Sequence, residues 1–235
     1  MAQKIVWVPD VGEVVLSKRK GAKSIRLSIS AAGKIRVGLP SWVPYSAGIS
    51  FVKSRSDWVK KHLDEHPAKI LANGERIGKS FRLNYAHNPS TARTTTRISG
   101  QDLNITSSMP LSSQTVQAAA VRASERALKL EAQKLLPERL AHLAAKHGFR
   151  YKSVRIKKLV SRWGSCSSDG IITLNFFLMQ LPWQLIDYVL VHELVHTKHL
   201  NHSVSFWNEF EAAYPGAKTS RKLIKAYRPV INSVA

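Results

Sequence analysis

The stretch VHELVHTKHLNHSVSFW, residues 191–207, decides how this chain is interpreted. It contains an HExxH motif, in which His192 and His196 are separated by one helical turn. Residues four apart lie on the same face of a helix, with Cβ atoms about 5–6 Å apart. Two imidazoles can therefore reach one metal ion at about 2.0–2.1 Å, the length of a Zn–N bond. Glu193 lies beside the first imidazole, where a carboxylate can act as a general base.

A catalytic zinc ion needs a third protein ligand and one open position. His199 shares the helix face, but it lies about 10 Å along the axis from His192, because each residue rises about 1.5 Å. We therefore expect His199 at the rim of the site. If the helix ends near Asn201, a residue that tolerates the left-handed conformation, the chain can turn and bring His202 back to the metal.

The predicted metal centre combines three histidines and one carboxylate. The expected Zn²⁺ ligands are His192, His196 and His202, and the expected catalytic residue is Glu193. Glu209 and Glu211 remain alternatives for the third ligand. The competing interpretation is a surface helix that carries histidines and binds no metal.

Apolar periodicity predicts that the first part of the chain is rich in β structure. Alternation over Ser24–Ile29 and over Lys34–Leu39 predicts a hairpin with its turn at Ala31–Gly33. A helix is expected from about Ala47 to Glu65. Further strands are expected at residues 80–85, 93–99 and 102–106, and a linker at 107–114.

The second part alternates helices with short strands. A long helix is expected over residues 115–147, with Pro137 kinking or restarting it. Pro182 should open the active helix, at about residues 183–200, and Ser203 should cap the next one. Strands are expected at 154–159 and 171–175. The prediction is an α+β protein with a β-rich N-terminal region, residues 1–110, and a compact domain, residues 111–235.

The charge balance is strongly basic. Lys and Arg number 36 and Asp and Glu 15, for a formal net charge of +21. Such a field attracts polyanions, so nucleic acid is a candidate partner through a basic surface. A merely solubilising surface is the alternative, and the sequence does not indicate an oligomeric state.

Other features bear on the compartment. The apolar segment at residues 185–191 is too short to span a bilayer, so we expect no membrane association. The N-terminus shows no secretory signal. Cys166 is the only cysteine, which excludes an internal disulfide. These features predict a cytoplasmic protein.

Three segments resemble the YgjP-like metallopeptidases, relatives of the WLM and SprT-like metalloproteases of the gluzincin type. They are RWGSC (162–166), DGIITLN (169–175) and residues 191–207. The resemblance is strongest over residues 150–230 and implies a compact zincin-like domain, a polypeptide substrate and the metal and catalytic residues given above. WLM and SprT relatives act on protein bound to DNA, which would give the basic charge a purpose.

The expected function is hydrolysis of peptide bonds by a zinc metallopeptidase. In zincins an edge strand pairs with the substrate backbone, and we assign that role to one strand of the hairpin that follows Arg162. Candidates for the stabiliser of the oxyanion are His199, Tyr214 and Arg162, whereas Cys166 is expected to be an inert thiol. The alternatives are a metal-dependent nucleotide phosphohydrolase and a nucleic-acid-binding protein with a non-catalytic zinc.

Overall fold

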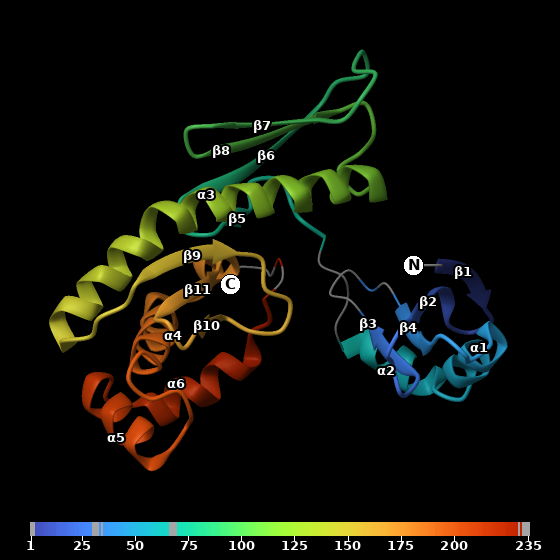
Figure 1. Ribbon diagram of the computed structural model, residues 1–235. Helices are drawn as coiled ribbons and strands as arrows, with labels where there is room; N and C mark the ends of the chain where they lie inside the picture. The colour runs from blue at the N-terminus through green and yellow to red at the C-terminus, as the bar shows by residue number, and fades with distance from the viewer. Residues whose placement is uncertain (1–2, 30–32, 34, 66–69, 230, 232–235) are drawn as a thin grey trace. The chain divides into compact units, whose positions relative to one another are not determined.

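The computed structural model describes residues 3–29, 33, 35–65, 70–229 and 231. The chain forms two compact units, Met1–Lys69 and Ile70–Ala235 (Figure 1). Both contain strands and helices, which confirms the α+β class. Among the described residues, no helix has the length and apolarity needed to cross a bilayer.

The first unit is a four-stranded sheet with two helices. The elements are β1 (Gln3–Val8), β2 (Gly12–Arg19), β3 (Arg26–Ile29), β4 (Ile35–Pro40), α1 (Tyr45–Lys53) and α2 (Ser56–Glu65). The strand order is β1-β2-β4-β3, with β2 and β4 parallel and the outer pairs antiparallel. One face of the sheet is buried against α1 and α2, where Leu16, Leu39 and Val52 are fully buried.

The predicted hairpin is confirmed, because β3 and β4 pair antiparallel. Ala31 and Ala32, in its predicted turn, lie outside the described residues. The single helix predicted from Ala47 to Glu65 is wrong in one respect, since the chain forms two helices there. Ser54 ends α1, and its hydroxyl donates a hydrogen bond of 2.9 Å to the carbonyl of Phe51.

The second unit begins with another four-stranded sheet. Its strands are β5 (Arg76–Ile77), β6 (Phe81–His87), β7 (Thr95–Ser99) and β8 (Asp102–Ser107). The order β5-β6-β8-β7, with β6 and β8 parallel, repeats the topology of the first sheet. This sheet packs on α3 (Gln114–His147), which lies between it and the rest of the unit (Figure 1).

The long helix α3 is continuous through Pro137, so the helix does not restart there. Leu136 and Leu140 are fully buried on either side of the proline, and their packing outweighs the missing backbone hydrogen bond. The hydroxyl of Ser113 caps the first turn, and Gly148, with φ of 68°, ends the helix. Because α3 covers β6–β8, the compact units divide between residues 69 and 70, and not at residue 110, where the boundary was expected from the sequence.

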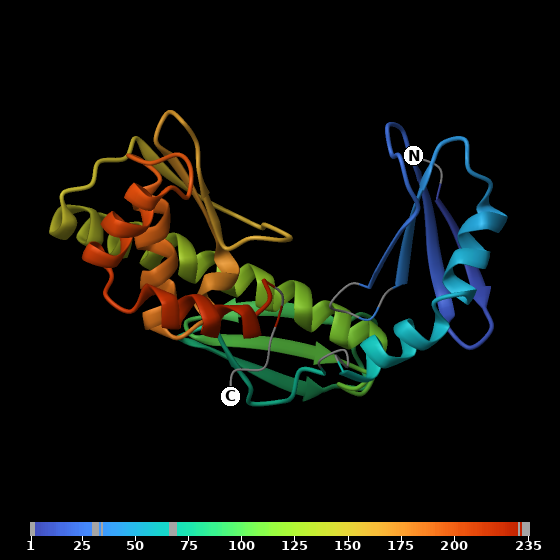
Figure 2. The same cartoon turned by 90° about the horizontal axis from the view of Figure 1, so that it is seen from below.

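The remaining elements surround the HExxH segment. They are β9 (Ser153–Lys157), β10 (Gly164–Cys166), β11 (Ile171–Asn175), the 3₁₀ helices η1 (Phe176–Gln180) and η2 (Ile224–Ala226), α4 (Trp183–Val195), α5 (Val204–Ala213) and α6 (Ala217–Leu223). The sheet order is β10-β11-β9, so β10 is an edge strand, and it packs against α4. Helices α5 and α6 also pack beside α4 (Figure 2).

We expect Glu131→Ala to lower the free energy of unfolding by about 1–3 kcal/mol, the cost of leaving buried donors unpaired. Glu131 is buried on α3, and its carboxylate accepts hydrogen bonds from the backbone N–H groups of Lys79, at 2.8 Å, and Ser80, at 2.6 Å. Urea unfolding of the two proteins measures the difference. The matched control is Glu138→Ala, an exposed carboxylate on the same helix, which should change the stability by less than about 0.5 kcal/mol.

Candidate metal centre

The helix α4 ends at Val195, five residues before its predicted end, and His196 is its C-cap residue. The N–H groups of Thr197 and Lys198 bond to carbonyls three residues earlier, at 3.0 Å each. The Thr197 hydroxyl also donates to the Leu194 carbonyl at 2.7 Å. These bonds tighten the last turn and release the chain from the helix axis. The loop that follows brings His202 back toward α4.

Three imidazole nitrogens converge at this turn. The Nε2 atom of His192 lies 3.2 Å from Nε2 of His196 and 3.1 Å from Nε2 of His202. The ligand atoms of the three residues all lie within 4.8 Å of one another. Tetrahedral zinc with Zn–N bonds of about 2.0–2.1 Å separates its ligand nitrogens by about 3.3–3.4 Å. The spacing therefore fits a single ion of this size.

The orientation of the His196 ring leaves its Nε2 lone pair free. Its Nδ1 lies 2.9 Å from the backbone carbonyl of His199, to which we assign the ring N–H as donor. A proton on Nδ1 leaves Nε2 unprotonated and aimed at the other two histidines. Such a hydrogen bond on the far nitrogen is the usual support of a metal-ligating histidine.

His192 is enclosed by aromatic rings. The centroids of Phe206 and Phe210 lie 5.0 Å and 5.4 Å from its own, and Tyr188 lies 6.2 Å away. This burial, together with the neighbouring histidines, lowers the pKa of His192 to about 3. The ring is therefore neutral at neutral pH, as a metal ligand must be. Its Nδ1 has no hydrogen-bond partner among the described residues.

Glu193 is buried against the edge strand β10. It is 5% exposed, and its Oε2 has no hydrogen-bond partner among the described residues. Burial raises the pKa of Glu193 to about 8, and the nearby Arg162 opposes this shift. A Cβ atom at Gly164 would lie 2.7 Å from Glu193 Oε1, closer than a Cβ atom can approach a non-bonded oxygen. The glycine therefore leaves the space that the carboxylate occupies.

Asn175 holds the segment that leads into β10. Its amide nitrogen donates to the carbonyls of Leu159, at 2.8 Å, and Arg162, at 2.9 Å. The side chain is fully buried, and its oxygen accepts from the N–H of Phe177 at 3.3 Å. Asn175 has no role that can be assigned from the sequence, because an asparagine at the end of a strand is common. The contact between Gly164 and Glu193 was not predicted from the sequence either, because β10 and α4 come together only in the folded protein.

The structure does not bring the two alternative carboxylates into the histidine cluster. Glu209 pairs with His199 at 2.6 Å and with Lys198 at 2.5 Å. Glu211 accepts a hydrogen bond from the N–H of Gly216 at 2.9 Å. Among the described residues, the group able to hold a metal contains the three histidines alone.

Two other candidate residues are engaged elsewhere. The Tyr214 hydroxyl donates to the Gln184 carbonyl at 2.9 Å. Cys166 is half-buried, and this burial, assisted by the charge of Glu193, raises the pKa of its thiol to about 11. Cys166 is therefore protonated at neutral pH and a poor nucleophile.

Comparison with known proteins defines the class. A family model described as YgjP-like, metallopeptidase domain matches residues 23–227. This match defines a metallopeptidase, an enzyme class that holds a metal ion, typically zinc. The chain belongs to the YgjP-like family, as the segments at 162–166, 169–175 and 191–207 predicted. A search of curated proteins found no match.

Two solved structures from archaea are similar to part of the chain. The metallopeptidase zymogen abylysin of Pyrococcus abyssi is 30% identical, with 41% of this chain and 100% of that chain covered and a TM-score of 0.37. The metallopeptidase zymogen jannalysin of Methanocaldococcus jannaschii is 20% identical, with 40% and 94% covered and a TM-score of 0.35.

We expect Gly164→Ala to reduce peptidase activity at least tenfold without loss of bound metal. The added methyl group would displace the Glu193 carboxylate, whereas the three histidines that could hold a metal ion would be unchanged. Activity on casein and metal content by mass spectrometry measure the two effects separately. Ser165→Ala, the neighbouring change on β10, is the control and should retain activity. Loss of metal from the Gly164 variant would contradict this division of roles.

Proposed function

We propose that this metallopeptidase is zinc-dependent, with His192, His196 and His202 as the ligands and Glu193 as the general base. The observation that supports this assignment is the convergence of three Nε2 atoms beside a buried carboxylate with an unpaired oxygen. Three neutral imidazoles suit zinc, and they leave one position of a tetrahedral ion open. In this arrangement the buried Glu193 carboxylate lies beside the metal site, where it can accept a proton from the attacking water.

The mechanism assigns the proton transfers to Glu193. When bound, zinc supplies a Lewis acid that polarises the scissile carbonyl and acidifies the attacking water. Glu193 accepts the proton of that water and passes it to the nitrogen of the leaving amine. Arg162 favours the ionised form of the carboxylate, which burial alone disfavours. The aromatic rings around His192 exclude bulk water from the inner side of the site.

The substrate is proposed to be an extended polypeptide paired with β10. This strand pairs with β11 along one edge, and its other edge has no strand partner among the described residues. Backbone pairing along an open edge gives affinity with little selectivity for sequence. Arg162, exposed at the entrance to this strand, is our candidate for the stabiliser of the oxyanion, because Tyr214 and His199 already have partners.

Two finer proposals rest on composition. The net charge of +21 supports activity on protein associated with nucleic acid, because such substrates carry dense negative charge. The single cysteine supports a reducing, cytoplasmic compartment. A nucleotide phosphohydrolase is not favoured, since such enzymes hold Mg²⁺ with carboxylates and the described residues offer an all-histidine group.

The test separates metal binding from catalysis. Glu193→Gln should retain one zinc ion per chain and lose at least a hundredfold in casein hydrolysis, because an amide accepts no proton. His202→Ala should lose both zinc and activity. Metal content, activity and the effect of a chelator are measured on each protein, with nucleoside triphosphates as the alternative substrate.

The matched control for the third ligand is His199→Ala. It removes an imidazole three residues from His202 but leaves the backbone carbonyl that orients His196. Zinc content should therefore be unchanged in this variant. Zinc retained by His202→Ala but lost by His199→Ala would contradict the ligand assignment. Full casein hydrolysis by Glu193→Gln would show that Glu193 is not the general base.

A further inference from the structure

The N-terminal sheet has one face that α1 and α2 do not cover. Successive side chains of a strand alternate between the two faces. Val14, Leu16 and Val37 point to the buried face with Val52 of α1, and each is 0% exposed. The residues between them point to the opposite face, which we call the open face. Its larger side chains are Ile5, Trp7, Val15, Arg19, Arg26 and Arg36.

Strand register places an apolar area at one end of the open face. Ile5 of β1 is opposite Val15 of β2, and Trp7 lies two residues along β1 on the same side. Trp7 is 78% exposed and Ile5 is 63% exposed, which is unusual for such large apolar side chains within strands. An exposed tryptophan in a rigid strand presents a flat ring at low entropic cost. It can therefore stack against another flat ring.

Arginines occupy the other strands of the same face. Arg36 of β4 is opposite Val15, and Arg26 of β3 and Arg19 of β2 flank Gly38. All three are exposed, and none forms an ion pair with another described residue. The acidic side chain on this face is Glu13, opposite Trp7. Three unpaired guanidinium groups and one carboxylate leave the open face positive.

We propose that the open face binds single-stranded nucleic acid. Unpaired bases stack on exposed aromatic rings, and arginines bind the phosphates that connect them. Four-stranded sheets with exposed aromatic side chains bind single-stranded RNA in this way. In a duplex the faces of the bases are stacked on one another, so they could not stack on Trp7. The proposal does not depend on the peptidase assignment, since the open face lies in the first unit and the histidine cluster in the second.

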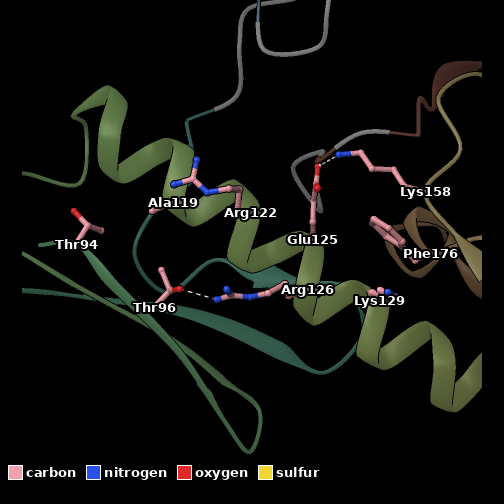
Figure 3. A pocket seen from close by; sticks show the side chains of 9 residues that line it. All are labelled: Thr94, Thr96, Ala119, Arg122, Glu125, Arg126, Lys129, Lys158 and Phe176. Atoms are coloured by element: carbon pink, nitrogen blue, oxygen red, sulfur yellow. Dashed lines mark hydrogen bonds and ion pairs between the residues drawn. The ribbon is translucent and has the colours of Figure 1, made fainter.

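A second basic surface provides a control for charge alone. A pocket of about 420 Å³ between α3 and β7 is lined by four basic residues, Arg122, Arg126, Lys129 and Lys158, and by Glu125, which pairs with Lys158 (Figure 3). Its aromatic residue, Phe176, is only 4% exposed and offers no free ring for stacking. This pocket therefore attracts anions without the feature that selects unpaired bases.

The experiment measures the affinity of the full chain for fluorescent 12-nucleotide dT and rU oligonucleotides and for a DNA duplex, over a range of salt. We expect both single strands to bind more tightly than the duplex. Trp7→Ala should weaken single-strand binding at least fivefold, as removal of one base–aromatic stack does. The double variant R26S/R36S should weaken it and lower the slope of log Kd against log salt by about 1–1.5, because two phosphate contacts are lost.

Each control removes the same type of side chain from another surface. Trp42→Ala removes a tryptophan that is 68% exposed but lies after β4, outside the strands. R122S/R126S removes two arginines from the α3 pocket. Both should retain binding within about twofold, and circular dichroism should show every variant folded. Equal losses in the control and open-face variants would overturn the proposal. So would preference for the duplex, or a dimer that Trp7→Ala dissociates with oligonucleotide affinity unchanged.

Discussion

The site depends on where α4 stops. If the helix continued to residue 200, His202 would lie beyond reach of the two histidines of the motif. Instead the backbone leaves the helix directly after His196, and the carbonyl of His199 accepts a hydrogen bond from the ring N–H that we assign to His196 Nδ1. One local event thus brings in the third imidazole and sets the ring orientation of the second. The 3.1 Å and 3.2 Å separations between nitrogens follow from it.

Burial acts in opposite directions on the two kinds of side chain at the site. Burial holds His192 neutral, which suits a metal ligand. It also favours the protonated form of Glu193, whereas a general base must be deprotonated to accept a proton. A cation held by the histidines, together with Arg162, would restore the ionised carboxylate. Under the proposed ligand assignment, the charge state of Glu193 is therefore coupled to occupation of the metal site.

The sequence predicted what local periodicity and spacing control. The HExxH pair, the turn before His202 and the cap at Ser203 are local features, and the structure places each accordingly. The sequence did not predict the contact between Gly164 and Glu193, because β10 and α4 meet only after the intervening β11 and η1 have folded. The end of α4 was placed five residues too late, since LVHTKHL lacks glycine or proline. Strands β1 and β2 were not placed individually, because the exposed Ile5 and Trp7 on β1 break the usual alternation of apolar and polar side chains.

All three imidazoles and the Glu193 carboxylate belong to a segment of eleven residues, His192 to His202. The space for the carboxylate, however, is left by Gly164 at the start of β10, 29 residues before Glu193, and Asn175 holds the segment that leads into this strand. Closing so short a loop around an ion requires little ordering of the chain. In the proposed site, capture of the ion and alignment of Glu193 would therefore be separable events. A protein that lacks the hydrogen bonds of Asn175 would then bind a full complement of metal and still be inactive. Metal content alone is therefore a poor measure of the fraction of active enzyme.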